Sequence, residues 1–130
     1  MMRVLLIDDT PEIAELLSFA LRDHGYDVLA VGFDPAIGDL VAEHRPDALV
    51  LDCTSYDMAE MLFDAVRASD EYAALPIVIV SDTPEKADAS LRRREAEHVL
   101  LIPKPFTGGQ IARALSQLLN QSPVPSPSNP

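Results

Sequence analysis

The sequence is poor in cysteine, because its 130 residues include only one, Cys53. An internal disulfide is therefore excluded, and the low cysteine content is typical of a reducing compartment such as the cytoplasm. Histidine is also scarce, and His24, His44 and His98 are scattered without the short spacings that bind zinc. The sequence thus predicts no zinc site, and it favours cytoplasmic localisation.

Long apolar runs and basic charge are lacking as well. No uncharged apolar stretch approaches the roughly 20 residues that a membrane-spanning helix needs, and no basic segment followed by an apolar one indicates a signal peptide. The chain has 21 acidic and 10 basic residues, a formal net charge of −11. Because nucleic-acid-binding surfaces are normally basic, we expect no direct nucleic-acid contact and no membrane contact.

What the sequence does contain is an alternation of two patterns. Short apolar runs are typical of buried strands, and apolar residues at helical spacing separate them. Prolines that follow a capping side chain mark helix starts at Thr10-Pro11, Asp34-Pro35 and Thr83-Pro84. The predicted strands are Val4–Ile7, Val28–Val31, Ala48–Leu51, Ile77–Val80 and Val99–Ile102. The predicted helices are Pro11–His24, Asp34–His44, Asp57–Ala68, Pro84–Glu97 and a last one that begins at Thr107.

The predicted helices are amphipathic, and two of them begin with a capping-box pattern. In this pattern a short polar residue is followed three positions later by Glu or Gln, as in Asp57 with Glu60 and in Thr107 with Gln110. The apolar residues expected to face the core are Ile13, Leu16, Leu17, Ala20 and Leu21 in the first helix, Met61, Leu62, Ala65 and Val66 in the third, Ala87 and Leu91 in the fourth, and Ile111, Ala114, Leu115, Leu118 and Leu119 in the last.

Five strand–helix units in succession predict an α/β fold. Continuous apolar strands that alternate with amphipathic helices imply a parallel sheet covered on both faces, a (βα)5 three-layer sandwich. We expect residues 1–121 to form this one domain. Residues 122–130 are rich in Ser and Pro, and we expect a disordered tail or a linker there.

Chemically active side chains follow four of the five predicted strands. In open α/β sheets, ligands bind outside the carboxyl ends of the strands. The first strand is followed by Asp8 and Asp9, the third by Asp52, the fourth by Ser81 and the fifth by Lys104. A carboxylate can attack phosphorus, a divalent cation can offset the negative charge, and a hydroxyl and an ammonium can bind phosphoryl oxygens. The pattern therefore indicates aspartyl-phosphate chemistry.

These residues resemble the receiver (CheY-like) domain of two-component response regulators. The matching pieces are the pair Asp8-Asp9, the strand-end Asp52, the hydroxyl of Ser81 and the motif Lys104-Pro105-Phe106, over roughly residues 3–120. The resemblance implies a flavodoxin-like fold with strand order 2-1-3-4-5. It also implies a cytoplasmic phosphoacceptor domain, and not an enzyme acting on other substrates.

The resemblance assigns a role to each site residue. Asp52 is the phospho-acceptor, and Mg²⁺ is held by Asp8, Asp9, Asp52 and the backbone carbonyl of Thr54. Ser81 and Lys104 bind the phosphoryl group, and the bond from Lys104 to Pro105 is cis. The implied partners are a histidine kinase or histidine phosphotransfer protein, a downstream effector that contacts the fourth helix, fifth strand and fifth helix, and a second copy of the chain in a homodimer.

Two departures from the family pattern leave alternatives open. The loop after Asp52 lacks the usual Pro and Gly, and Leu101 stands where the family has an aromatic switch residue. A pseudo-receiver, a phosphorylation-independent interaction module with the same fold, is therefore the main alternative. A hydrolase that uses an aspartyl phosphate is less well supported, because Thr54 stands where such enzymes carry a second Asp. A redox role for Cys53 is disfavoured, since nearby carboxylates raise the pKa of a thiol.

Overall fold

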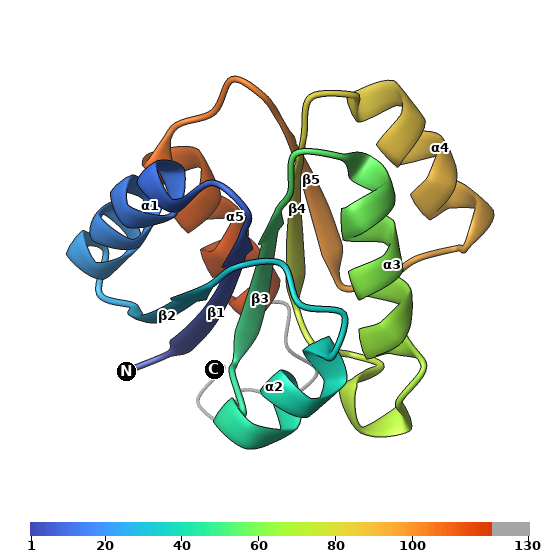
Figure 1. Cartoon of the computed structure of the whole chain (residues 1–130), viewed down its shortest axis with the longest axis horizontal. Coiled ribbons are helices and arrows are strands. Elements are labelled where there is room, and N and C mark those ends of the chain that lie inside the picture. Colours follow the sequence, from blue (N-terminus) through green and yellow to red (C-terminus); the bar gives the residue numbers. More distant parts are fainter. Residues whose placement is uncertain (121–130) are drawn as a thin grey trace, which may run out of the picture.

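The computed structural model describes residues 1–120, which form a three-layer α/β sandwich (Figure 1). The predicted tail, residues 122–130, lies outside the described residues. The elements along the chain are β1 (Arg3–Asp8), α1 (Pro11–Asp23), β2 (Asp27–Val31), α2 (Ile37–His44), β3 (Ala48–Asp52), α3 (Tyr56–Arg67), a 3₁₀ turn η1 (Asp70–Tyr72), β4 (Ile77–Ser81), α4 (Pro84–Arg93), β5 (Val99–Pro103) and α5 (Gly108–Asn120).

The five strands form one parallel sheet in the order β2-β1-β3-β4-β5, as the resemblance implied. The order reverses between β1 and β3, so the carboxyl ends of these two strands flank the switch point at which ligands bind in such sheets. In the register of β1 and β3, Asp8 lies directly opposite Asp52. The loops that follow β3, β4 and β5 lie at the same end of the sheet, at the top of Figure 1.

Alternate strand residues face opposite sides of the sheet and build two cores. Val4 and Leu6 pack with α1 and α5, whereas Leu5 and Ile7 pack with α2, α3 and α4. All residues of β3 and β4 are buried, which explains their uninterrupted apolar sequences. The predicted α/β class and its five strand–helix units are thereby confirmed.

The predicted apolar face of α1 is partly wrong. The buried residues of this helix are Ala14, Leu17, Ser18 and Leu21, whereas Leu16 is 69% exposed. The helix is apolar over more than half of its circumference, so its periodicity does not show which stripe faces the sheet. Ile13 of α1 was also predicted to face inward but is 38% exposed, and in α3 the same prediction is wrong for Met61, which is 53% exposed, and for Ala65.

Helix ends also differ from the prediction. The capping box at Asp57 is wrong: α3 begins one residue earlier, and its cap is Ser55, whose hydroxyl accepts a hydrogen bond from the Asp57 amide. Helix α2 begins at Ile37 rather than at Asp34. Helix α4 ends at Arg93 rather than at residue 97, and the 3₁₀ turn η1 was not predicted. The capping box of α5 is confirmed by reciprocal hydrogen bonds between Thr107 and Gln110.

None of the helices within residues 1–120 is both long enough and apolar enough to cross a membrane.

Candidate functional site

Two buried carboxylates form the centre of the candidate site. Asp8 ends β1 and Asp52 ends β3, and they are 4% and 2% exposed. They are register partners on adjacent parallel strands, so both side chains belong to the same rim of the sheet. Two like charges held this close out of water repel each other unless a proton or a cation intervenes.

The environment of Asp8 changes its protonation. The pKa of Asp8 is raised to about 7, mainly by burial and to a smaller extent by the neighbouring carboxylates of Asp52 and Asp9, against the lowering effect of the Thr10 amide. That amide donates a hydrogen bond of 2.9 Å to Oδ1 of Asp8. Oδ2 of Asp8 is buried and has no hydrogen-bond partner among the described residues. A buried carboxylate oxygen without a partner is suited to bind a proton or a cation.

Lys104 supplies the positive charge of the site. Its Nζ lies 3.0 Å from Oδ1 of Asp52 and 3.4 Å from the carbonyl oxygen of Cys53. The backbone positions this lysine: its amide donates to the carbonyl of Ser81 at 2.8 Å, and the peptide bond to Pro105 is cis, as the resemblance implied. The end of β5 is thus held beside the end of β4, from which the lysine reaches Asp52 on β3.

Ser81 is the last residue of β4, and its hydroxyl faces the loop that leads to α4. Ser81 is buried, and its Oγ accepts a hydrogen bond of 3.0 Å from the Thr83 amide and lies 3.2 Å from Oγ1 of Thr83. Thr83 is the N-cap residue of α4, so a change at the Ser81 hydroxyl acts directly on the start of this helix. The sequence prediction did not select Thr83, although a Ser-x-Thr-Pro sequence after a strand is a typical turn signal.

Asp9 is held by the loop that follows Asp52. The Thr54 amide donates to both carboxylate oxygens of Asp9, at 3.1 and 3.2 Å, and the Thr54 hydroxyl donates to Oδ2 as well. The sequence prediction considered only the backbone carbonyl of Thr54, and it missed this side-chain contact. The contact joins the ends of β1 and β3 across the switch point, and it fixes the direction of the Asp9 carboxylate.

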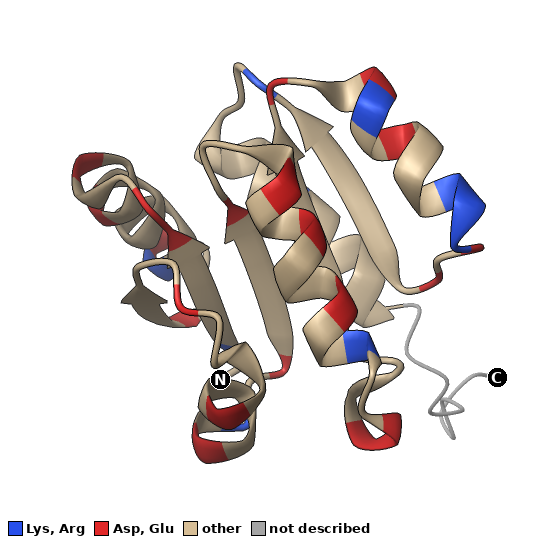
Figure 2. Ribbon diagram, turned by 45° about the vertical axis from the view of Figure 1, so that its right-hand side comes forward, with Lys and Arg blue, Asp and Glu red and all other residues tan. Residues whose placement is uncertain are grey.

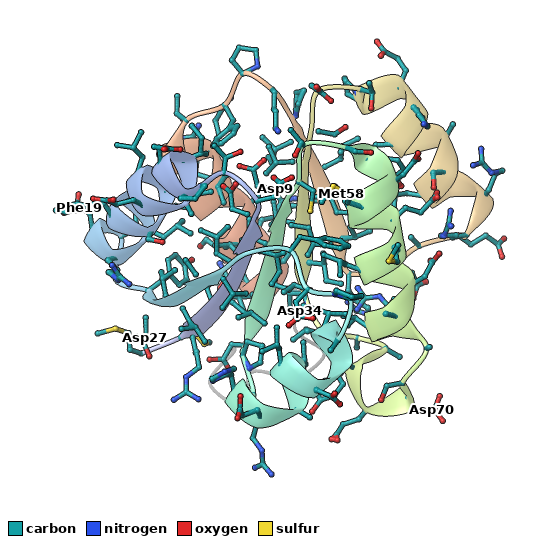
Figure 3. All side chains as sticks on the ribbon, in the orientation of Figure 1. Asp9, Phe19, Asp27, Asp34, Met58 and Asp70 are labelled. Carbon is teal, nitrogen blue, oxygen red and sulfur yellow. The ribbon has the colours of Figure 1, made fainter. Side chains whose placement is uncertain are left out.

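The donor atoms at this rim suit a hard divalent cation. Asp9 lies among the side chains at the carboxyl ends of the strands (Figure 3) and is hydrogen-bonded to Thr54. The described part of the chain holds no ready-made cluster of three metal-ligating side chains. The available groups are nevertheless carboxylate oxygens at the rim, including the unpartnered Oδ2 of Asp8. Oxygen donors of this kind are the preferred ligands of Mg²⁺ and Ca²⁺.

Cys53 is an unreactive neighbour of the site. Its side chain is buried, and burial raises the pKa of the thiol to about 12, with further contributions from Asp9, Asp52 and Asp8. The thiolate is the reactive form of cysteine, so this residue has almost none of it at neutral pH. The expectation of a raised pKa is confirmed, with burial rather than charge as its main cause.

The fold and the site together define an α/β domain of the flavodoxin-like class with an acidic site at its switch point. The family model of the response regulator receiver domain matches residues 4–116. The chain therefore belongs to the receiver domain family of two-component response regulators.

Curated relatives agree with this assignment. The chain is 30% identical over 124 residues to the probable transcriptional regulatory protein TcrX of Mycobacterium tuberculosis, covering 93% of this chain and 51% of TcrX. It is 28% identical over 125 residues to the DNA-binding response regulator MtrA of Mycolicibacterium smegmatis, covering 95% of this chain and 54% of MtrA. The chain thus spans about half the length of the curated relatives it matches.

Solved structures show the same fold. The signal receiver domain of a signal transduction histidine kinase from Syntrophus aciditrophicus has a TM-score of 0.81 at 19% identity, covering 98% of this chain and 96% of that one. The receiver domain of the sensor histidine kinase PA1611 from Pseudomonas aeruginosa, described with a magnesium ion coordinated in its active site cleft, has a TM-score of 0.71 at 22% identity, covering 92% of this chain and 98% of that one.

Proposed function

We propose that Asp52 accepts a phosphoryl group from a phosphohistidine of a histidine kinase or histidine phosphotransfer protein, in a Mg²⁺-dependent phosphorelay. The observation that carries the proposal is the position of Asp52. Its carboxylate is 2% exposed, lies opposite Asp8 in the sheet register, and has the ammonium of Lys104 at 3.0 Å. A nucleophile and a cation for the transferred group are thus already in contact.

The transfer exchanges one bond for another. A carboxylate oxygen of Asp52 attacks the phosphorus atom, the P–N bond of the phosphohistidine breaks, and an acyl phosphate forms. Lys104 then pairs with a phosphoryl oxygen instead of with the carboxylate alone, and the Ser81 hydroxyl donates a hydrogen bond to another. Little further covalent chemistry is needed, because positioning and neutralisation of charge supply most of the catalysis of such transfers.

The proposed ligands of Mg²⁺ are Asp8, Asp9, Asp52 and the backbone carbonyl of Thr54. When bound, Mg²⁺ offsets the negative charges of the acids and of the phosphoryl oxygens. The fit is supported by the carboxylate donor set and by the unpartnered Oδ2 of Asp8. Mg²⁺ is also named for the PA1611 receiver domain.

The remaining parts of the proposal concern partners and output. As a signalling domain the chain transfers a phosphoryl group only to and from itself, and we place it in the cytoplasm. The new charge on Asp52 alters the face formed by α4, β5 and α5, which an effector or a second copy of the chain then binds. MtrA is described as DNA-binding, but we assign no nucleic-acid contact to this acidic chain, whose net charge of −11 opposes it.

The test is a small phosphoryl donor and a mass measurement. The protein is incubated with acetyl phosphate or phosphoramidate, with and without Mg²⁺, and its intact mass is recorded before and after hydroxylamine treatment. We expect one hydroxylamine-labile phosphoryl adduct that requires Mg²⁺ and disappears in Asp52→Asn. Asp70→Asn, an exposed aspartate on η1 before β4, is the matched control and retains the adduct. A folded wild-type protein that forms no adduct at any donor concentration contradicts the proposal and favours the pseudo-receiver.

A further inference from the structure

Helix α4 has few apolar residues with which to hold its place on the domain. Only two of its side chains are buried, Ala87 and Ser90, and one of them is polar. Leu91 adds a partly buried contact to the core. Burial of apolar area on this scale anchors a helix weakly. Helix α4 also packs against β5, and polar contacts to α3 supplement this small apolar anchor.

Four residues form a continuous polar contact between α3 and α4, which we call the α3–α4 clasp. They are Glu60 and Asp64 on α3 together with Ser90 and Arg94 at the end of α4. The Ser90 hydroxyl donates to Oε2 of Glu60 at 2.6 Å and accepts from an Arg94 Nη1 hydrogen at 2.6 Å. Nε and Nη2 of Arg94 donate to the two carboxylate oxygens of Asp64 at 2.8 and 2.9 Å.

The spacing of these residues explains why the two helices can meet through them. Residues four apart lie on one face of a helix, and both Glu60–Asp64 and Ser90–Arg94 have this spacing. Figure 2 shows the acidic positions that recur along α3 and the basic positions near the end of α4. The contact between Ser90 and Glu60 is partly shielded from water, since Ser90 is 1% exposed and the Glu60 side chain is 30% exposed, whereas the Asp64 side chain is 51% exposed. The strength of the Arg94–Asp64 contact therefore comes from its bidentate, charge-assisted geometry and from its place in a network of four residues.

The two clasped helices begin at the two loops of the phosphorylation site. Helix α3 begins at Tyr56, just after the Asp52–Ser55 loop, and α4 begins at Pro84, just after Ser81. The Ser81 hydroxyl interacts with Thr83, the N-cap of α4. A phosphoryl group that engages this hydroxyl therefore acts on the first turn of α4. At the aromatic switch position, Leu101 packs against the core on the α3 side of the sheet and has no polar tip to couple to Ser81.

We propose that the α3–α4 clasp is the fixed point about which α4 responds to phosphorylation. The clasp holds the last turn of α4 on α3, and withdrawal of the Ser81 hydroxyl from Thr83 releases only its first turn. The helix thus tilts about Ser90 and Arg94 instead of detaching. The holding role of the clasp stands by itself, whereas the response to phosphorylation rests on the proposed function of Asp52.

The first test is hydrogen exchange of the unphosphorylated full chain. Arg94→Gln removes the fork to Asp64, and we expect amide exchange in α4 to rise about tenfold or more while α1 is unchanged. Arg92→Gln is the matched control, because it removes the same charge from the same helix but pairs only with Asp88 on α4 itself. The control should stay within about twofold of wild type. Equal exchange in Arg94→Gln and wild type overturns the holding role.

The second test adds Mg²⁺ and phosphoramidate and follows the adduct by intact mass in the same samples. In wild type we expect faster exchange in the first turn of α4, with the last turn still protected. In Arg94→Gln the whole helix should exchange fast while the adduct yield persists. If the wild-type protein forms the adduct and amide exchange rises along the whole of α4, the proposal that the clasp is a fixed point is overturned. If no adduct forms, the proposed function of Asp52 is contradicted. The holding role of the clasp is then decided by the first test, which uses the unphosphorylated protein. Ser90→Ala provides a milder second variant if Arg94→Gln fails to fold.

Discussion

Lys104 and Asp52 form an ion pair across an intervening strand. Their side chains are 3.0 Å apart, although Asp52 ends β3, Lys104 follows β5, and β4 lies between these strands in the sheet. The lysine therefore spans the end of β4, above Ser81, to reach the buried carboxylate. Because Asp52 is 2% exposed, this pair is the main compensation for its negative charge from the described side chains.

The first prediction concerns the loss of this ion pair. Lys104→Gln should lower the free energy of unfolding by about 2 kcal/mol at neutral pH, since it leaves a buried carboxylate without its charged partner. It should also reduce formation of the Asp52 adduct strongly. Urea unfolding and intact mass measure the two effects.

Lys86→Gln is the matched control for Lys104→Gln. Lys86 pairs with Asp57 at 3.2 Å, but their side chains are 62% and 73% exposed, so this pair should contribute less than about 1 kcal/mol. Equal destabilisation by the two variants would show that burial of Asp52 does not strengthen its ion pair.

The second prediction is a pH dependence that originates in Asp8. Burial raises the folded-state pKa of Asp8 from about 4 to about 7, so between these values the folded state binds more protons than the unfolded state. The contribution of Asp8 to stability is then full below about pH 4, falls as the pH rises to 7, and stays low above that. Asp8→Asn removes the cost of burying a charge, and in EDTA it should raise the free energy of unfolding at pH 8 by about 1 kcal/mol or more.

The control for this prediction is the difference between two pH values. At pH 4 the Asp8 carboxyl is protonated in the folded protein, so Asp8→Asn should leave the free energy of unfolding nearly unchanged. A gain that is the same at pH 4 and pH 8 would mean that it arises from something other than the charge of Asp8.

The sequence allowed the site residues to be listed but not their contacts. Asp8, Asp52, Ser81 and Lys104 could be found because a parallel sheet brings the carboxyl ends of its strands to one edge. The bonds from Thr54 to Asp9 and from Ser81 to Thr83 depend on loop conformations that have no periodic signal. Their discovery required coordinates, since several short polar residues in each loop could have formed them.

For the helices, the sequence pattern likewise predicts where a helix lies in the chain but not which of its faces is buried. Periodicity located α1 and α3, but it placed Leu16 and Met61 inside, where the structure has them exposed. A helix with many apolar residues has more than one plausible buried stripe, and the partner surface selects among them. For α1 this partner surface includes the start of α5, where Gly108 lies close to Ala20.

The third prediction concerns this close approach of α1 and α5. Gly108 is the first residue of α5, and a Cβ atom added to it would lie 2.3 Å from Cβ of Ala20 on α1. The added methyl group would meet a methyl group on rigid backbone, so one helix must shift. Gly108→Ala should therefore lower the free energy of unfolding by about 1–3 kcal/mol, measured by chemical denaturation.

Two further variants separate the clash from other effects at Gly108. Gly109→Ala is the matched control, because a Cβ there meets only atoms 3.8 Å away, from Arg113 and Thr107. It should be neutral or slightly stabilising, since Ala is favoured over Gly in a helix. The double variant Gly108→Ala with Ala20→Gly should lose less stability than the sum of the single variants. If the losses of stability in the two single variants simply add in the double variant, the contact between residues 108 and 20 is not the cause of the destabilisation.

The last prediction concerns Arg67, which joins three segments at the end of the sheet opposite the candidate site. Its guanidinium donates to the carbonyls of Tyr72 and Glu97 at 3.0 Å and of His98 at 3.1 Å, and lies 5.0 Å from the centroid of the Phe63 ring. Arg67→Ala removes these three hydrogen bonds and the contact with Phe63, although the Tyr72 and His98 carbonyls keep the amides of Leu75 and Ile77 as donors. It should lower the free energy of unfolding by about 1–3 kcal/mol. Arg67→Lys keeps the charge but lacks the planar fork, so it should restore only part of the loss. If Arg67→Lys has the same free energy of unfolding as wild type, the positive charge, and not the planar guanidinium, is what stabilises these contacts.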